Sequence, residues 1–487
     1  MSPVRTLIAT LALAAAPGLA LPAGAQSAAP SAAAPPAADA PLRPDQAAFF
    51  DLYRELVETN TVVNVGSCTR AAQQLAARMK AAGFTDDQLT LFATPDHPQD
   101  GGLVAVYPGT ARKAKPILLL AHLDVVAAKR EDWTRDPFRL VEENGYYYGR
   151  GTVDDKAMAA VWTDALIRFR QSGYKPRRTV KLALTCGEET TWAFNGAEWL
   201  AANRRDLIDA EFALNEGGGG KSDGHGKLLV QSMQVGEKGV QNFRIETTNP
   251  GGHSSIPVPE NAIYQLADAL VRIRAYDFPL ELSDTTRAYF LTAGAARKDA
   301  MGKAMVAIAV DPGDKAAEAL LNTDRTYHSM LRTTCVATLV EGGHANNALP
   351  QRAAANINCR IFPGHGTEEV RAALAAAIGD ARVTITPVPP LRPIARPPAL
   401  DRRIIGPAEK LVARYFPGVP LVPTMSTGAT DAVFLGAVGI PTYGVPGPWG
   451  DPDGNGVHGL NERIEKRSLY VGRDYLFDLV KAYADQE

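Results

Sequence analysis

Three short apolar runs decide the fold: K-P-I-L-L-L at Lys115–Leu120, T-V-K-L-A-L-T at Thr179–Thr185 and A-E-F-A-L at Ala210–Leu214. Nearly continuous apolar runs of this length are typical of strands that are buried on both faces of a parallel sheet. Segments with helical periodicity, such as Asp45–Asn60 and Thr69–Ala82, alternate with them. The pattern predicts an α/β fold with a mixed, mostly parallel sheet flanked by helices.

Polar side chains follow each of these runs. They are His122 and Asp124 after the first, Glu188 and Glu189 after the second, and Asn215 and Glu216 after the third. Open α/β sheets bind ligands at the carboxyl ends of their strands. We therefore expect these side chains to lie together at one edge of the sheet.

The pattern changes in the middle of the chain. Gly239–Thr247, Arg332–Glu341 and Ala353–Phe362 alternate like half-buried strands, and Glu260–Arg274 and Thr367–Ile378 have helical periodicity. Two strand-helix-strand halves predict a small ferredoxin-like α+β domain. We expect it to be inserted at residues 236–390, between catalytic segments 43–235 and 391–487, with the Pro-rich stretch Pro387–Pro398 as hinge.

The amino terminus has the features of a cleaved signal peptide. Arg5 precedes an apolar run from Leu7 to Ala16, and Ala23-Gly24-Ala25 supplies the small residues that a signal peptidase recognises. Residues 1–25 are therefore expected to be removed on export to the periplasm or the medium. Residues 26–42, rich in Ala, Pro and Ser, are expected to form a flexible tether.

Composition narrows the classes of partner. The 487 residues carry 51 Lys and Arg against 53 Asp and Glu, a formal net charge of −2. This balance gives no electrostatic reason to expect nucleic acid as a partner, and no segment after the signal is long and apolar enough for stable insertion into a membrane. A small substrate is favoured. The four cysteines show no C-x-x-C pair and are expected to contribute little to the fold, and whether Cys335 pairs with Cys359 stays open.

The ionisable residues at the strand ends have the composition of a metal site. His122, Asp154, Glu189, Glu216 and His458 offer two imidazoles and three carboxylates, which suit two zinc ions sharing one aspartate. Each residue alone also has an ordinary interpretation, because a buried histidine or a helix-capping acid is common. The order of all five along the predicted sheet edge favours the metal site.

Seven motifs occur in order: H-x-D, G-R-G-x-x-D-D-K, G-E-E, N-E-G-G, G-G-H-S-S, N-x-L-P followed by C-R-I, and H-G-x-N-E. Together they resemble the co-catalytic di-zinc carboxypeptidase and aminoacylase family of metallopeptidases. That family includes glutamate carboxypeptidases, carboxypeptidase S, aminoacylase-1, carnosinase-type dipeptidases and succinyl-diaminopimelate desuccinylase. The resemblance covers the chain from about Asp45 to its end and implies a zinc-exopeptidase-like catalytic domain with an inserted lid and dimerisation domain.

The resemblance implies a role for each residue of the metal site. His122 and Glu216 would bind one Zn²⁺, Glu189 and His458 the other, and Asp154 would bridge them, with Co²⁺ or Mn²⁺ as expected substitutes. Two further residues would act beside the metals: Asp124 would orient His122, and Glu188 would be the general base. The Asp154–Asp155 peptide bond is expected to be cis.

In the inserted domain and the last segment, the resemblance implies contacts to substrate. His253 would stabilise the oxyanion, often from the partner subunit of a homodimer, and Asn347 would bind substrate. Arg360 and the backbone at Gly428 would bind a substrate carboxylate. The region Ala288–Asp324 matches no motif, and we expect it to shape the acyl or peptide pocket.

These roles predict zinc-dependent hydrolysis of an amide bond next to a free carboxylate, in an N-acyl amino acid or at the C-terminus of a peptide. In the family that the sequence resembles, Glu rather than Asp at the position of Glu216 is typical of the carboxypeptidase or acylase type, so the resemblance implies that type here. The alternative is a dipeptidase or aminopeptidase on the same metal site. G-G-G-G-K-S at Gly217–Ser222 lacks the first glycine of a phosphate-binding loop, and Ser254 and Ser255 do not form G-x-S-x-G, so nucleotide binding and serine hydrolysis are not predicted.

Overall fold

The three apolar runs form neighbouring parallel strands, β6 (Val180–Thr185), β3 (Ile117–His122) and β7 (Phe212–Asn215), with β3 in the middle. They lie within a ten-stranded mixed sheet of order β1-β2-β6-β3-β7-β17-β9-β8-β18, in which β16 pairs with β9. The remaining strands are β1 (Leu89–Thr94), β2 (His97–Tyr107), β8 (Gly219–Ser222), β9 (Leu228–Glu237), β16 (Leu421–Ser426), β17 (Thr442–Gly444) and β18 (Trp449–Gly450). The predicted α/β class with a mixed sheet is confirmed.

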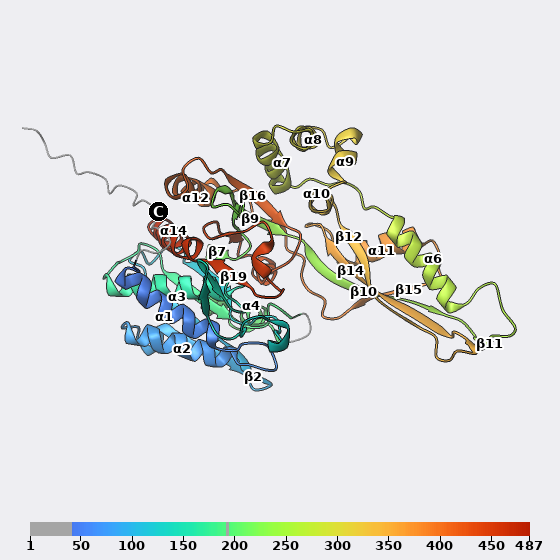
Figure 1. Cartoon of the computed structure of the whole chain (residues 1–487), viewed down its shortest axis with the longest axis horizontal. Coiled ribbons are helices and arrows are strands. Elements are labelled where there is room, and N and C mark those ends of the chain that lie inside the picture. The colour runs from blue at the N-terminus through green and yellow to red at the C-terminus, as the bar shows by residue number, and fades with distance from the viewer. Residues whose placement is uncertain (1–40, 191–193) are drawn as a thin grey trace, which may run out of the picture. The chain divides into compact units, whose positions relative to one another are not determined.

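The computed structural model describes residues 41–190 and 194–487 (Figure 1). The predicted signal peptide and all but the last two residues of the predicted tether lie outside this part of the chain. Within it, no helix combines the length and the apolar character needed to cross a bilayer.

Alternate residues of β3 pack on opposite faces of the sheet, which explains its continuous apolar sequence. Ile117 and Leu119 join one buried cluster, and Leu118 and Leu120 join another. The first cluster is covered by α1 (Pro44–Glu58), α2 (Cys68–Ala81), α3 (Lys156–Gln171), α12 (Arg402–Tyr415) and α14 (Lys466–Ala484). The second is covered by α4 (Gly196–Asn203), α5 (Arg205–Ile208) and α13 (Ala432–Ala437).

Short elements complete the catalytic part. A three-stranded sheet has the order β19 (Arg463–Glu465), β5 (Tyr146–Tyr148) and β4 (Val141–Glu143). Three single-turn helices are η1 (Asp86–Gln88), η2 (Arg130–Asp132) and η3 (Gly454–Gly456).

The inserted sheet is antiparallel, with the order β12 (Thr334–Gly342), β14 (Arg352–Ile361), β10 (Gly239–Thr248) and β15 (Thr384–Val388). Helices α6 (Ala262–Ala275) and α11 (Thr367–Ile378) pack on it through one apolar cluster. This arrangement is the predicted ferredoxin-like one. A two-stranded ribbon, β11 (Gly252–His253) with β13 (Ala348–Leu349), extends from the end at which β10 and β12 finish.

Four helices that the sequence patterns did not predict interrupt this domain between α6 and β12. They are α7 (Asp284–Ala296), α8 (Ala300–Val310), α9 (Lys315–Leu321) and α10 (Arg325–Met330). They share a small core around Phe290, Met305 and Leu321, and α7 packs against β16. The unassigned region 288–324 is therefore a helical subdomain with its own core.

Two disulfides link the four cysteines: Cys68 to Cys186, and Cys335 to Cys359. The expectation that cysteines contribute little to the fold is wrong, because the first bond joins the start of α2 to the end of β6 across 118 residues. The second joins directly opposite residues of β12 and β14 and settles the pairing left open above. Spacing could not reveal the first pair because only the tertiary fold brings its partners together.

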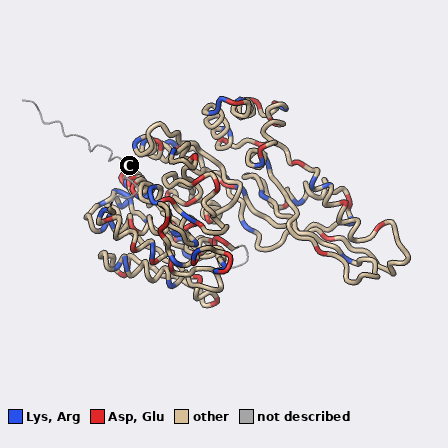
Figure 2. The backbone as a smooth tube through the Cα atoms, in the orientation of Figure 1, with Lys and Arg blue, Asp and Glu red and all other residues tan. Residues whose placement is uncertain are grey.

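Lys and Arg are interspersed with Asp and Glu over the catalytic and inserted parts (Figure 2). Ion pairs such as Arg150 with Glu462 and Arg473 with Asp164 are buried. The mixture agrees with the formal net charge of −2.

Candidate active site

The candidate ligands lie at the carboxyl ends of neighbouring strands. His122 is the last residue of β3, Glu188 and Glu189 follow β6, and Glu216 follows β7. Asp154 lies in the loop before α3, and His458 in the loop after η3. The two histidines differ in burial: His122 is 2% exposed and His458 56%.

Asp154 lies between two groups of side chains. Its Oδ1 is 3.1 Å from Nε2 of His122, which is 3.7 Å from Oε1 of Glu216. Its Oδ2 is 3.0 Å from Nε2 of His458, which is 2.9 Å from Oε2 of Glu189. The structure thus brings together all five residues that the sequence singled out, with one carboxylate oxygen of Asp154 turned to each pair.

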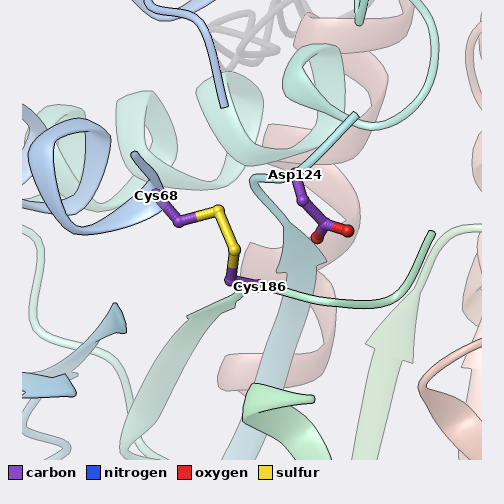
Figure 3. Close-up of side chains that lie close together, drawn as sticks. All are labelled: Cys68, Asp124 and Cys186. Atoms are coloured by element: carbon purple, nitrogen blue, oxygen red, sulfur yellow. A yellow bond between two sulfur atoms is a disulfide. The ribbon is translucent and has the colours of Figure 1, made fainter. Parts of the chain in front are cut away.

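Asp124 holds the loop that carries Glu188 and Glu189. Its two carboxylate oxygens accept the backbone N–H groups of Glu188 (3.3 Å) and Glu189 (3.0 Å). Nδ1 of His122 lies 3.0 Å from the carbonyl oxygen of Asp124 and 3.6 Å from its Oδ1. Figure 3 shows Asp124 beside the Cys68–Cys186 disulfide, which fixes the start of the same loop. The carboxylate of Asp124 therefore holds the loop, and its backbone carbonyl oxygen, at 3.0 Å, is the atom that orients the His122 ring.

Two acids that the sequence analysis left without a role hold the Asp154 loop. Glu462 accepts the backbone N–H groups of Val153 and Asp154 at 2.8 and 3.1 Å, and Asp155 accepts the backbone N–H of His122 at 3.3 Å. The Asp154–Asp155 peptide bond is cis, as predicted. Both acids stood within the quoted motifs, and only the loop geometry reveals what they bind.

Burial and crowding of acids shift several pKa values at this edge. Burial raises the pKa of Glu188 and of Glu216 well above the usual range, and neighbouring carboxylates add to the shift. The pKa of Asp154 is low, because hydrogen bonds from the two histidines outweigh its burial. The hydrogen bonds of His458 to Asp154 and to Glu189 raise the pKa of His458 to about 10. The cluster therefore favours cations.

The donor set fits metal ions. Among the described residues, His122, Asp154 and Glu189 offer ligand atoms within 4.8 Å of one another, as do His122, Glu188 and Glu216. Oε1 of Glu189 is buried without a hydrogen-bond partner in the described part of the chain. An unpaired buried carboxylate oxygen is costly unless it has a cationic partner. Imidazole and carboxylate ligands suit zinc and related transition metals.

A pocket of about 160 Å³ adjoins the cluster and contains Arg360. Glu188 and Glu189 line one side of it, and Ala429 and Thr430 line another. Within the described residues no carboxylate lies at ion-pair distance from Arg360, and burial lowers the pKa of its guanidinium. A second guanidinium that the sequence analysis missed, Arg392, also lines the pocket and donates to the carbonyl oxygen of Thr190 at 2.8 Å.

The Gly428 loop is held by contacts within the protein. The N–H of Gly428 donates to Oγ of Ser426 at 3.0 Å. The N–H of Thr430 donates to Oε2 of Glu237 at 3.1 Å, and burial raises the pKa of Glu237 to about 8. Gly428 was expected to donate its N–H to a substrate carboxylate, but Oγ of Ser426 already accepts this N–H. Ala429, between Gly428 and Thr430, lines the Arg360 pocket.

His253 and Asn347 lie away from Arg360. His253 is in β11, and Asn347 directly precedes β13 and accepts the N–H of Ser254 through its carbonyl oxygen. His253 and Asn347 therefore both lie at the β11–β13 ribbon, where both are exposed. In the register of β10 and β14, Arg360 pairs with Val240 at the opposite end of these strands. At about 3.3 Å per residue the two ends are roughly 30 Å apart. The structure does not bring His253 and Arg360 together within one chain.

A mixed α/β sheet that gathers imidazole and carboxylate side chains around one aspartate at its strand ends is typical of metal-dependent hydrolases. Residues 118–482 match the model of Peptidase family M20/M25/M40, and the chain belongs to this family.

Comparisons with individual proteins agree with this assignment to the family. The chain is 28% identical over 388 residues to the N-fatty-acyl-amino acid synthase/hydrolase PM20D1 of Homo sapiens, covering 78% of this chain and 76% of the relative. It is 27% identical over 394 residues to a probable carboxypeptidase S-like protein of Dictyostelium discoideum, covering 78% and 74%. Its fold is similar to that of an M20 family metallo-carboxypeptidase from Sulfolobus solfataricus, with a TM-score of 0.66, 19% identity and coverage of 91% and 100%.

Proposed function

We propose that the protein hydrolyses an amide bond next to a free carboxylate, in an N-acyl amino acid or at the C-terminus of a peptide. The observation that carries this proposal is the position of Arg360. Its guanidinium lies in a pocket beside Glu188 and Glu189 with no carboxylate partner in the described residues. A planar guanidinium is suited to bidentate recognition of a carboxylate. The names of the PM20D1 and carboxypeptidase S-like relatives support the same class of substrate.

The residues of the chain divide the reaction between them. Arg360 holds the substrate carboxylate and so places the neighbouring carbonyl at the cluster around Asp154. Metal ions bound there would polarise that carbonyl and lower the pKa of a water molecule. Glu188 accepts the proton of the attacking water and passes it to the leaving amine, a role to which its raised pKa is suited. Asp124 keeps Glu188 in place through the loop backbone.

The test compares substrates that differ only in the carboxylate. N-acetyl amino acids and the corresponding amino acid amides would be assayed with the mature protein. We expect amidation to lower kcat/KM by roughly 100-fold or more, because the half-buried guanidinium of Arg360 then loses its charged partner. Equal turnover of both sets, or activity only on substrates with a free amino terminus, would contradict the proposal and favour the dipeptidase or aminopeptidase alternative.

Two Zn²⁺ ions per subunit are the proposed cofactors. His122 and Glu216 would hold one ion, Glu189 and His458 the other, and Asp154 would bridge them, which the distances above support. Treatment with a chelator should abolish hydrolysis, and Zn²⁺ or Co²⁺ should restore it. A protein without hydrolysis in either state would be a binding module instead.

A homodimer through the inserted domain is the proposed assembly. Strand β12 is an edge strand of its sheet, and Val336, Leu339 and Val340 on it are 60%, 72% and 72% exposed. Exposed apolar edge strands favour pairing with a second copy. Analytical ultracentrifugation should show a dimer, and Leu339→Glu should convert it to a monomer. A wild-type monomer at micromolar concentration would contradict the assembly.

Export is the proposed fate of the chain. The pattern of residues 1–25 supports it. The two disulfides support it as well, because such bonds persist in oxidising compartments. Amino-terminal sequencing of the protein recovered from the periplasm or medium should begin at Gln26, whereas recovery of the uncleaved chain in the cytoplasm would contradict export.

A further inference from the structure

Asp431 is a buried acid beside the Arg360 pocket. It is 2% exposed and directly follows Thr430, which lines that pocket. It occupies the N-cap position of α13, but its side chain makes no capping hydrogen bond to that helix. Its Oδ1 instead accepts the amide of Asn195 at 2.6 Å, and its Oδ2 accepts the hydroxyl of Thr185 at 2.9 Å. Helix capping therefore does not explain this acid.

The carboxylate of Asp431 gives a short, charge-assisted hydrogen bond to the Asn195 amide. Such bonds are roughly twice as strong as those between neutral groups. They have a cost here, because the two donors, an amide and a hydroxyl, are neutral and offset less of the desolvation of a buried carboxylate than a cation would. The aspartate thus holds the Asn195 amide firmly in one orientation at a cost in stability.

Asn195 connects Asp431 to the loop that carries Glu188. The side chain of Asn195 is 3% exposed, and its Oδ1 caps α4 by accepting a backbone N–H of that helix. Its Nδ2 donates to the carbonyl oxygen of Gly187 at 3.3 Å as well as to Asp431. One side chain therefore joins the start of a helix, the acid beside the Arg360 pocket and the residue that precedes Glu188.

The loop also touches the start of α4 through its backbone. The carbonyl oxygen of Cys186 accepts the N–H of Gly196 at 2.7 Å. Gly187 has a φ of +96°, and a Cβ there would collide with the carbonyl oxygen of Phe194. No side chain larger than that of glycine fits this close approach. The position of the loop and that of the first residues of α4 are therefore coupled.

Glu188 is thus held at two points. The carboxylate of Asp124 accepts its N–H, and the amide of Asn195 donates to the carbonyl group before it. We propose that Asn195 and Asp431 are a pair of positioning residues that place Glu188, the general base, relative to the Arg360 pocket. One hydrogen-bonded network then sets the distance from the bound substrate carboxylate to the base. This inference rests on the proposed function and adds two residues to its mechanism.

Asn195→Ser tests this pair while it keeps the helix cap. Serine caps a helix about as well as asparagine, but its hydroxyl is too short to reach both Asp431 and the carbonyl oxygen of Gly187. With the zinc-loaded mature protein and an N-acetyl amino acid, we expect kcat to fall by about 100-fold, the loss that a misplacement of about 1 Å can cause. KM should stay within about twofold, because Asn195 lies outside the lining of the Arg360 pocket.

Asn261→Ser is the matched control. Asn261 is a buried asparagine of the inserted domain that caps α6 by accepting the N–H groups of Ile263 and Tyr264. The same substitution there should leave both kcat and KM at their wild-type values. A wild-type protein without any hydrolysis of N-acetyl amino acids would contradict the proposed function itself. Wild-type kcat in Asn195→Ser would leave that function standing and overturn the positioning pair.

Two changes at Asp431 should have graded effects. Asp431→Asn keeps an oxygen for the Asn195 amide without the charge, so it should lower kcat by only about tenfold. Asp431→Ser removes this contact and should lower kcat by about 100-fold. Adding Asn195→Ser to Asp431→Ser should cause little further loss, because both changes break the same link. Multiplication of the two losses in the double variant would contradict a shared role.

Two measurements separate displacement of the base from other causes of lost activity. Elemental analysis of Asn195→Ser should give the zinc content of the wild type. A crystal structure of this variant should show the Glu188 carboxylate displaced by about 1 Å or more. Loss of zinc, or a Glu188 carboxylate in its wild-type place, would overturn the assignment to the base.

A second variant carries the test if Asn195→Ser fails to fold. Thr185→Val keeps the shape of the buried threonine at the end of β6 and removes the hydroxyl that Asp431 accepts. It should lower kcat by about tenfold at unchanged KM, because one oxygen of the buried carboxylate then loses its donor. Wild-type kcat in Thr185→Val would contradict the role of Asp431.

Discussion

At the strand ends of the catalytic sheet, side chains from widely separated segments meet within 4 Å, whereas in the inserted sheet the candidate residues lie a full strand length apart. His122, Asp154 and His458 form the first group, and His253 and Arg360 form the second. Parallel strands bring their carboxyl ends to one edge, so a single chain can complete a site there. A long antiparallel hairpin separates its two ends. The comparison teaches that the catalytic sheet gathers its candidate residues within one chain, whereas the inserted sheet keeps His253 and Arg360 at opposite ends of the same chain.

The largest expected effect lies on the catalytic side of this comparison. Glu188→Gln should lower kcat by roughly 10³-fold, in the middle of the range for loss of a general acid or base. Metal content should stay at the wild-type value, because the proposed ligands remain. Steady-state kinetics with elemental analysis checks both. Glu198→Gln, an exposed glutamate on α4, is the control. Substantial activity in Glu188→Gln would remove this residue from the mechanism.

His253 tests whether the distal ribbon acts across subunits. If His253 stabilises the oxyanion that forms in the active site of the partner subunit, His253→Ala should lower kcat by about 100-fold. Mixing His253→Ala with Glu188→Gln protein under conditions of subunit exchange should restore about a quarter of the wild-type sites, because half of the random dimers are mixed and each holds one complete site. No recovery in a confirmed mixed dimer would contradict a role in trans.

Arg360 tests the near end of the same sheet. Arg360→Ala should raise KM and lower kcat/KM by about 100-fold on N-acyl amino acids, through loss of a charge-assisted contact in a half-buried pocket. Arg352→Ala changes an arginine at the other end of β14 that is 65% exposed and paired with Glu246, so it should keep wild-type kinetics. Full kcat/KM in Arg360→Ala would show that the carboxylate is held elsewhere.

The smallest effect concerns Glu237, the last residue of β9, where the chain leaves the catalytic sheet and enters β10 of the inserted sheet. Its pKa is raised to about 8 by burial, so between pH 5 and 8 the folded protein binds more protons than the unfolded chain. Wild-type stability should therefore fall as pH rises through this window, by about 1.4 kcal/mol per pH unit at most. Glu237→Gln should lose this slope. Urea unfolding of both proteins at pH 5, 6.5 and 8 checks it, and parallel curves would contradict a buried neutral carboxyl.

Much of the catalytic edge could be predicted from the sequence because it depends on local signals. Apolar runs such as Ile117–Leu120 mark buried strands, and ionisable residues directly after them must lie at the strand ends. The ferredoxin-like order of the insert followed from alternating patterns in the same way. The metal-ligand roles themselves came from the resemblance of motifs and stay predictions.

Other features depend on tertiary proximity, which local patterns do not encode. The Cys68–Cys186 bond and the contact of Asp124 with the Glu188 backbone join segments far apart in the chain. The helical subdomain around Phe290 was not predicted because the hydrophobic periodicity of its short helices is weak. Arg392 lay in a Pro-rich stretch interpreted only as a hinge, and nothing in its neighbours pointed to the pocket.

Anomalous diffraction from crystals grown with Zn²⁺, measured on both sides of the zinc absorption edge, tests the central claim most directly. We expect two peaks about 3.5–4 Å apart, the usual spacing of two-metal sites. Asp154 should lie between them, with His122 and Glu216 at one peak and Glu189 and His458 at the other. A single peak, or peaks away from Asp154, would contradict the account.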